Sequence, residues 1–291
     1  RNKYNKDFFY RYKKLKEVVS KGYEVVLSPM YSREFFVGDT IVNLVHADKK
    51  IGSSGDISNI RIWQKKISDK YYSNLISAKT GTMFEFNRNK EFFENLLNVK
   101  LDIVKPNINL KLKKSNFHFS KKYLILFIGA SKNDRKWDVE RFAKIGEYLK
   151  EKYKYEIVLC GAKSDSDDAL KFQFFFNGNY VDLVGKTSLI DLLYVISGGA
   201  LMISNETSAA HMAVALNMKN LLVISNGNHY RRFTPYPKEV SENYHVIYHP
   251  RISENLAYYK KLSDDYGFKS DLDINEISVD RLKEKLDDFL I

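Results

Sequence analysis

Between residues 121 and 225 the sequence alternates short apolar runs of strand length with longer segments of helical spacing. The runs expected to form strands are Tyr123–Ile128, Tyr155–Cys160, Tyr180–Val184, Ala200–Ser204 and Asn220–Ser225. The helices expected between them are Val139–Tyr153, Asp167–Phe176, Ser188–Ser197 and Ser208–Asn217. Both faces of these strands are apolar, as in a parallel sheet that helices cover on both sides. The pattern therefore predicts a doubly wound α/β domain.

The segment before residue 121 shows the same alternation less completely. The expected helices are Tyr10–Lys21, Phe35–His46 and Lys90–Asn98, and the expected strands are Tyr23–Leu27 and Lys49–Gly52. Two strand–helix units are too few for a self-sufficient domain of this type, and the chain opens with Arg1 rather than Met. We therefore expect roughly 60–80 residues of a first α/β domain to precede Arg1.

Three parts are expected along the chain: an incomplete N-terminal domain over residues 1–117, a second α/β domain over residues 118–270, and a C-terminal helix within residues 271–291. Val104–Ser120 mixes Asn, Lys and apolar residues around Pro106, which indicates a linker with an edge strand. Ile277–Leu290 is amphipathic and should pack against a domain.

Composition and charge limit the classes of function. Cys160 is the single cysteine and lies in an apolar run, so a buried, inert thiol is expected and a disulfide framework or CxxC zinc site is excluded. No run reaches the length of a membrane span, and the first twenty residues are basic, aromatic and polar, unlike a signal peptide. Residues 1–120 hold 23 Lys/Arg and 12 Asp/Glu, whereas residues 121–291 hold 24 of each. The basic first part favours an anionic partner, such as a phosphorylated glycolipid, an anionic membrane or nucleic acid; the alternative is a set of solvated lysine-rich faces.

Ligands of doubly wound sheets bind at the carboxyl ends of the strands, so the loops there are the candidate sites. The loop Gly129–Trp137 (GASKNDRKW) matches neither GxGxxG nor the phosphate-binding P-loop. Its small residues followed by cations at a helix start still suit a diphosphate, with a solvated polar loop as the alternative.

A second loop, Asn205–His211 (NETSAAH), follows the strand that ends at Ser204. Asn205, Thr207 or Ser208 can cap the next helix and leave amides facing a phosphate, while Glu206 can accept hydrogen bonds from a sugar hydroxyl. His211 lies one turn along; without other information, a packed core histidine is the more common outcome.

Two further loops, Gly185–Leu189 and Asn226–Phe233, also follow strands and carry polar or basic side chains. The second contains two Arg, a His and two Asn, which indicates a residue set that lines a cleft. Asp165–Ser166–Asp167 matches the short DxD pattern of metal-dependent glycosyltransferases, but it lies at a helix start, where Asp and Ser are ordinary caps. We therefore reject it as a metal site.

Taken in order, the segments GAS, RKW, VLCGA, LVGKTSL, ISNETSAAH and NGNHYRRFTPYP resemble the ADP-heptose:lipopolysaccharide heptosyltransferase family (glycosyltransferase family 9). The resemblance covers about residues 121–240 and extends weakly to residues 10–52. It implies a GT-B architecture, in which two Rossmann-like domains face a cleft, with the N-terminal domain incomplete here. It also implies an inverting glycosyltransferase that works without a catalytic metal or a further cofactor.

The family's donor motif, D-T-G-x-x-H, reads Glu206-Thr207-Ser208-Ala209-Ala210-His211 in this chain. Glu in place of Asp and Ser in place of Gly should reshape the sugar pocket. By resemblance, the residues expected to bind the donor diphosphate and sugar are Ser131, Arg135, Lys136, Glu206, Thr207, Ser208 and His211. Those expected near the nucleoside are Lys186, Thr187 and Leu189. Those expected at the acceptor or cleft are Tyr31, Ser32, Arg33, Asn228, His229 and Arg232.

The family's catalytic base is expected in an N-terminal segment that precedes this chain. Gly38-Asp39 falls inside a predicted helix, and we interpret it as a coincidence. The predicted reaction moves heptose or a related sugar from a nucleoside diphosphate, ADP-linked by resemblance, to lipopolysaccharide or another surface glycan. The alternatives are a nucleotide-sugar-binding protein without turnover and a sugar-nucleotide epimerase of the same fold.

The expected partners are the nucleotide sugar and an anionic glycolipid or surface-glycan acceptor. The sequence lacks a helix-turn-helix pattern and an aromatic-basic RNA motif, so no nucleic acid is expected. The expected location is the cytoplasm, with a peripheral position at the inner face of the bacterial membrane as an option.

Overall fold

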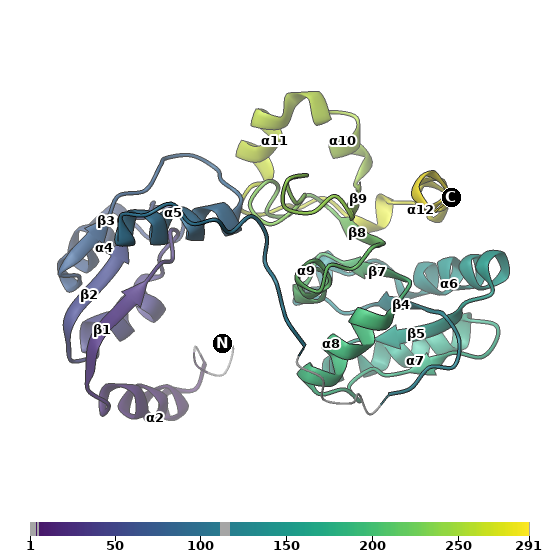
Figure 1. Ribbon diagram of the computed structural model, residues 1–291, viewed down its shortest axis with the longest axis horizontal. Helices are drawn as coiled ribbons and strands as arrows, with labels where there is room; N and C mark the ends of the chain where they lie inside the picture. Colours follow the sequence, from purple (N-terminus) through teal and green to yellow (C-terminus); the bar gives the residue numbers. More distant parts are fainter. Residues whose placement is uncertain (1–3, 5, 111–116, 291) are drawn as a thin grey trace. The chain divides into compact units, whose positions relative to one another are not determined.

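The structure of the protein, a computed structural model, describes residues 4, 6–110 and 117–290 (Figure 1). The chain divides into two compact units, residues 1–103 and residues 104–291. Each unit contains one parallel sheet, of three strands in the first and six in the second. No helix among the described residues is long and apolar enough to cross a membrane.

Unit 1 is built around strands in the order β1-β2-β3, all parallel. Its strands are β1 (Tyr23–Ser28), β2 (Ala47–Ser53) and β3 (Asn74–Ile76). Its helices are α2 (Phe8–Val19), the π-helix η1 (Phe35–Asp39), α3 (Thr40–Leu44), α4 (Ile62–Ser68), the 3-10 helix η2 (Asp69–Tyr71) and α5 (Glu85–Leu97).

The prediction of two strand–helix units in this part was wrong, because α4 follows β2 and β3 precedes α5, which makes three units. β3 has three residues, too few to form an apolar run that stands out in the sequence. The expected helix Phe35–His46 is present as a π-helical turn followed by α3, which ends at Leu44. The expected edge strand in Val104–Ser120 is absent from residues 104–110 and 117–120, and the rest of that segment lies outside the described residues.

Unit 2 contains a six-stranded sheet in the order β6-β5-β4-β7-β8-β9, with every neighbouring pair parallel. Its strands are β4 (Tyr123–Phe127), β5 (Glu156–Cys160), β6 (Val181–Asp182), β7 (Leu201–Asn205), β8 (Leu221–Ser225) and β9 (Tyr244–Tyr248). Its longer helices are α6 (Val139–Tyr153), α7 (Ser166–Phe175), α8 (Leu189–Gly198), α9 (Ser208–Ala215), α11 (Tyr259–Tyr266) and α12 (Val279–Phe289), with the short helix α10 (Pro250–Ser253) after β9.

The doubly wound sheet predicted for this part is confirmed, with one strand more than expected. The sixth strand, β9, was missed because His245 interrupts its apolar run and a polar, proline-containing segment precedes it. The apolar centre of the sheet is fully buried, as Leu124, Leu126 and Leu159 illustrate at 0% exposure. The burial predicted for Cys160 is also confirmed, and burial raises the pKa of its thiol to about 12.

Strand order reverses around β4, which pairs with β5 on one side and with β7 on the other. Leu126 is opposite Leu159 in β5 and opposite Ile203 in β7. The chain therefore leaves the carboxyl ends of β4 and β7 in opposite directions, and a crevice is expected between the two loops. This switch point positions the candidate site.

Candidate functional site

A cavity of about 540 Å³ lies at the carboxyl ends of β4, β5 and β7. It is lined by Phe127, Gly129, Ala130, Ser131, Arg135, Ala162, Ser164, Asp165, Glu206, Thr207, Ser208, His211, His229 and Phe233. The set includes all of the predicted diphosphate- and sugar-binding residues except Lys136. Loops that are more than 70 residues apart in the sequence therefore meet at one hollow, where the sheet topology predicts a ligand.

Arg135 and Glu206 connect the two main loops of this cavity. Arg135 Nη2 donates a hydrogen bond to the Glu206 carbonyl oxygen (2.6 Å) and lies 3.3 Å from Glu206 Oε1. Ser225 Oγ donates to Glu206 Oε2 at 2.7 Å, so a residue at the end of β8 holds the carboxyl group as well. Arg135 Nε has no hydrogen-bond partner among the described residues. This nitrogen is itself buried, whereas the Arg135 side chain as a whole lines the cavity.

Burial dominates the protonation of Glu206, whose exposed fraction is 4%. Burial raises the pKa of its carboxyl group to about 7, although Arg135 and the hydrogen bond from Ser225 both act to lower it. Near neutral pH this side chain is therefore divided between the carboxylic acid and the carboxylate. It can donate or accept a hydrogen bond within the cavity.

Two histidines of the cavity are held in their neutral forms. Burial and the Arg135 guanidinium lower the pKa of His211, whose Nδ1 shares a 2.8 Å hydrogen bond with the Tyr236 hydroxyl. Burial, then Arg135 and Arg232, lowers the pKa of His229 to about 4. His229 has φ +56°, in the left-handed region, and its ring packs edge-on against Phe233. Neutral imidazoles at these positions are hydrogen-bonding groups rather than cations at pH 7.

Asn205 is a residue of the site whose role sequence reasoning missed. It is 0% exposed at the end of β7, where Nδ2 donates to the Ile128 carbonyl oxygen (2.8 Å) and Oδ1 accepts from the Trp137 amide (3.0 Å). Its side chain therefore joins the loop after β4 to the end of β7. Of the three residues predicted as possible caps of α9, Thr207 is the N-cap, and its Oγ1 accepts from the Ala209 amide. The sequence feature that could have indicated this role is a polar residue at the end of an apolar strand.

Lys136 has a different position from its neighbour Arg135. Its Nζ binds Asp165 Oδ1 and Asp168 Oδ2, both at 2.7 Å, and it is not among the residues that line the cavity. Asp165 is 3% exposed and also accepts a hydrogen bond from the Ala162 amide. The DxD-like segment thus has a structural partner in Lys136. The described residues contain no group of three or more His, Cys, Asp or Glu side chains that could hold a metal ion.

The residues predicted to lie near the nucleoside are at the start of α8, outside the lining of the cavity. Lys186 Nζ binds Asp182 in an exposed ion pair, and Leu189 is 60% exposed. In the last predicted loop, Asn228 is buried, and the Arg232 guanidinium lies over the Phe268 ring at 4.6 Å.

The predicted acceptor residues of unit 1 follow β1. The Arg33 side chain is 1% exposed and lies between the carboxylates of Asp39 and Asp69, with its guanidinium 5.0 Å from the centre of the Tyr72 ring. Ser32 Oγ donates to Asp56, and the Tyr31 ring lies under the guanidinium of Arg88. Asp39, which also accepts a hydrogen bond from the Tyr72 hydroxyl (2.7 Å), is 1% exposed. Arg33 and Asp39 therefore belong to the polar interior of unit 1.

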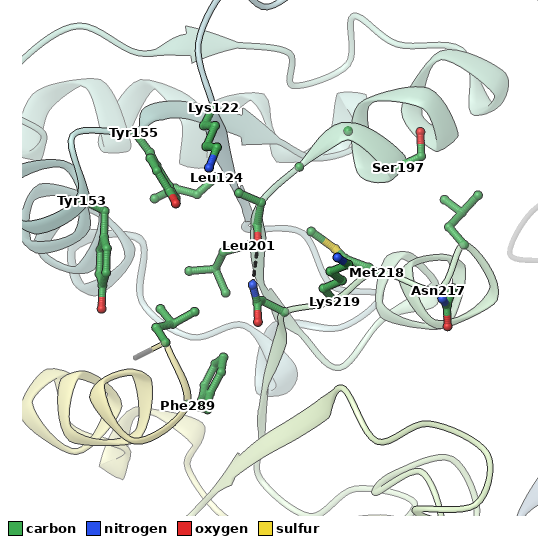
Figure 2. Close-up of a pocket in the computed structure, with 16 residues that line it drawn as sticks. Lys122, Leu124, Tyr153, Tyr155, Ser197, Leu201, Asn217, Met218, Lys219 and Phe289 are labelled. Carbon is green, nitrogen blue, oxygen red and sulfur yellow. Dashed lines mark hydrogen bonds between the residues drawn. The ribbon is translucent and has the colours of Figure 1, made fainter.

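A second hollow, of about 570 Å³, lies at the opposite end of the unit 2 sheet (Figure 2). It is bordered by Lys122 and Leu124 near the start of β4, by Leu201 at the start of β7 and by Phe289 of α12. Asn220 Nδ2 donates to the Ala200 carbonyl oxygen across it at 2.9 Å. None of the predicted site residues lines this hollow. Because ligands of doubly wound sheets bind at the carboxyl ends, the cavity around Arg135 is the better candidate.

Three solved structures with the same overall fold give the cavity a context. E. coli heptosyltransferase WaaC with ADP has a TM-score of 0.68 and 16% identity over 99% of this chain and 81% of its own. The glycosyl transferase family 9 protein of Veillonella parvula has a TM-score of 0.63 and 15% identity over 96% of this chain and 77% of its own. E. coli ADP-heptose lipopolysaccharide heptosyltransferase II has a TM-score of 0.59 and 14% identity over 96% of this chain and 80% of its own.

These likenesses agree with the prediction of a GT-B type fold, with a smaller sheet in the N-terminal unit. Comparison with curated protein sequences gives no significant match. The family model of glycosyltransferase family 9 (heptosyltransferase) matches residues 11–255, which is most of the chain. The chain therefore belongs to glycosyltransferase family 9 (heptosyltransferase).

Proposed function

We propose that the protein transfers heptose or a related sugar from an ADP-linked donor, bound in the cavity around Arg135, to a hydroxyl of lipopolysaccharide or another surface glycan. The observation that carries the proposal is the meeting of a cation, a buried carboxyl group and a helix N-terminus at the sheet switch point. Two structures of E. coli WaaC, with ADP and with ADP-2-deoxy-2-fluoro heptose, support the choice of nucleotide.

The leaving diphosphate needs positive charge and hydrogen-bond donors. Arg135 supplies the charge, because its side chain lines the cavity. The amides at the start of α9 and the hydroxyls of Thr207, Ser208 and Ser131 supply further donors. Such groups stabilise charge that develops on the leaving group as the glycosidic bond to phosphate breaks.

The sugar would lie against the uncharged groups of the cavity. When the Tyr236 hydroxyl donates to His211 Nδ1, the proton of the neutral imidazole is on Nε2, which can then donate to a sugar or phosphate oxygen. Glu206 and His229 offer further hydrogen bonds to hydroxyl groups. Lys136 contributes indirectly in this scheme, because its ion pairs hold the loop after β4 against α7.

The first test is calorimetric titration of the protein with ADP. Arg135→Ala should weaken ADP binding by about 10- to 100-fold, the equivalent of one or two charge-assisted hydrogen bonds. Lys144→Ala, which removes an exposed ion pair on α6, is the matched control and should leave the affinity unchanged. Equal affinities for ADP in the wild type and Arg135→Ala would exclude the assignment of Arg135.

The second test is incubation with ADP-heptose and other nucleotide sugars, with products identified by mass spectrometry. Transfer of the sugar to a glycan acceptor, with inversion at the anomeric carbon, is the expected result. ADP binding without transfer or donor hydrolysis would favour a binding protein over a transferase.

A further inference from the structure

His211 lies in the first turn of α9, and its imidazole lines the candidate cavity. Within the described part of the chain, the ring makes one hydrogen bond, between Nδ1 and the Tyr236 hydroxyl at 2.8 Å. Tyr236 is 8% exposed and is not among the residues that line the cavity. Nδ1 is therefore bound to the interior of unit 2, and Nε2 is the nitrogen left for a ligand.

The core of unit 2 holds Tyr236 in place. Its ring packs against Tyr244, the first residue of β9, with the ring centres 4.7 Å apart. The Tyr244 hydroxyl shares a 2.7 Å hydrogen bond with Thr234 Oγ1, and both of these side chains are buried. The position of the Tyr236 hydroxyl is therefore set by the packed interior and does not depend on what occupies the cavity.

The hydrogen bond between Tyr236 and His211 has two possible directions, which leave different groups in the cavity. If the hydroxyl donates to Nδ1, the imidazole proton is on Nε2, and Nε2 is a donor. If Nδ1 donates to the hydroxyl oxygen, Nε2 is a bare acceptor that would face a ligand with its lone pair. The direction of this bond therefore decides which ligand atoms His211 can bind.

The chemistry of the two partners favours donation by Tyr236. Burial raises the pKa of its hydroxyl to about 12, so the phenol keeps its proton at neutral pH. Burial and then Arg135 lower the pKa of His211, so the imidazole is neutral and has one nitrogen without a proton. A phenol is a stronger donor than a neutral imidazole N–H, and an imidazole nitrogen is a stronger acceptor than a phenol oxygen. The hydroxyl proton therefore points to Nδ1.

The groups beside His211 also fit a donor at Nε2. The Arg135 guanidinium, the Ser208 hydroxyl and the first amides of α9 lie at the same cavity, and all of them can donate to an anion. An Nε2–H adds one more donor to this set. A bare Nε2 would instead place a lone pair against the oxygens of the same anion.

We propose that Tyr236 is a positioning residue of the transfer reaction. Its hydroxyl holds His211 in the tautomer with the proton on Nε2, and this N–H donates to a diphosphate oxygen of the sugar donor. The inference rests on the proposed function, because it takes the diphosphate as the ligand. No proton is transferred in this step: the hydrogen bond strengthens as negative charge develops on the leaving diphosphate.

Nitrogen NMR of the protein with isotope-labelled histidine identifies the tautomer without ligand or turnover. At neutral pH, the His211 signals, assigned by their loss in His211→Gln, should show a protonated Nε2 and a bare Nδ1. Tyr236→Phe should move both signals toward the average of the two tautomers, because the ring packing is kept and the hydroxyl is lost. A proton on Nδ1 in the wild type would overturn the proposal, as would identical signals in the wild type and Tyr236→Phe.

The matched control is Tyr123→Phe. The Tyr123 hydroxyl is also buried and donates to the Val195 carbonyl oxygen at 2.7 Å, outside the lining of the cavity. Removing it should cost stability as Tyr236→Phe does, but should leave the His211 signals unchanged. Equal changes in the two variants would show a general effect of losing a buried hydroxyl and would overturn the proposal.

Calorimetric titration with ADP measures the consequence for binding. Tyr236→Phe should weaken ADP binding about two- to tenfold, the range of one neutral hydrogen bond, and Tyr123→Phe should leave it unchanged. In a His211→Ala background, Tyr236→Phe should change the affinity by less than about twofold, because its effect passes through the imidazole. Equal losses in both backgrounds would overturn the proposal.

Failure of this inference is distinguishable from failure of the proposed function. ADP binding that depends on Arg135 but not on Tyr236 would overturn the role of Tyr236 and leave the proposed function intact. ADP binding that does not depend on Arg135 would refute the proposed function, and with it the diphosphate as the ligand of His211, whichever tautomer the NMR signals show.

Discussion

Replacing Glu206 with Gln should change how the stability of unit 2 depends on pH. The carboxyl group has a pKa of about 7 in the folded protein and 4.5 as its ordinary value, because burial outweighs the favourable effect of Arg135. The folded state therefore keeps a proton that the unfolded state has already lost between these two pH values. The stability that this proton provides is fully present below pH 4.5 and is lost as the pH rises through 7.

A difference of about 2.5 pKa units corresponds to about 3 kcal/mol between pH 4.5 and pH 8. Gln cannot ionise, so the free energy of unfolding of Glu206→Gln should rise by about 3 kcal/mol relative to that of the wild type as the pH increases from 4.5 to 8. Altered hydrogen bonds to Ser225 and Arg135 add a constant to the stability difference between variant and wild type and do not change how that difference depends on pH. Urea unfolding at a series of pH values, followed by Trp137 emission in a Trp63→Phe background, measures this pH dependence.

The control is Glu151→Gln, on the exposed face of α6. The difference in free energy of unfolding between this variant and the wild type should be the same at pH 4.5 and pH 8. The reasoning is refuted if the difference between Glu206→Gln and the wild type is the same at pH 4.5 and pH 8. That result would mean that Glu206 is ionised at both, with the Arg135 ion pair stronger than the cost of burial.

Three further outcomes are expected from the same geometry. Lys136→Met should lower the free energy of unfolding by about 2–3 kcal/mol in urea unfolding, because it leaves the buried Asp165 without its cation. Adding Asp165→Asn should restore the stability, and a double variant that stays as unstable as Lys136→Met would contradict the pairing. Asn205→Ala should cost about 2–3 kcal/mol by thermal unfolding, because the Trp137 amide and Ile128 carbonyl lose their partner; a cost below about 0.5 kcal/mol would show that water replaces it. Arg135→Ala should raise the pKa of His211 and of His229 in NMR titrations, since burial and then the guanidinium lower both; unchanged values would show that burial alone sets them.

Periodicity predicted most of unit 2 because its strands are buried on both faces and its helices are long enough to repeat their apolar pattern. Val139–Tyr153 was predicted with the bounds that α6 has in the structure. Unit 1 was harder, because α4 exposes its apolar residues and buries its polar ones. A helix of this kind gives no ordinary amphipathic signal, and β3 is too short to give one of its own.

The candidate cavity was predictable from topology, because the carboxyl ends of parallel strands bring distant loops together whatever side chains they carry. The sequence could not separate Arg135 from Lys136, since both are cations in one loop. In the structure Arg135 ends a 3-10 turn and reaches the loop after β7, whereas the extended Lys136 reaches Asp165 and Asp168 on the side of β5 and α7. Their different partners depend on the backbone turn between them and on the acids that flank it. Lys136 pairs with two carboxylates, whereas Arg135 pairs with one carboxyl group whose pKa burial raises to about 7 and which is therefore only partly ionised at neutral pH. Arg135 thus keeps more charge for a diphosphate, so the partners of a residue, rather than its type, decide which of the two serves the ligand.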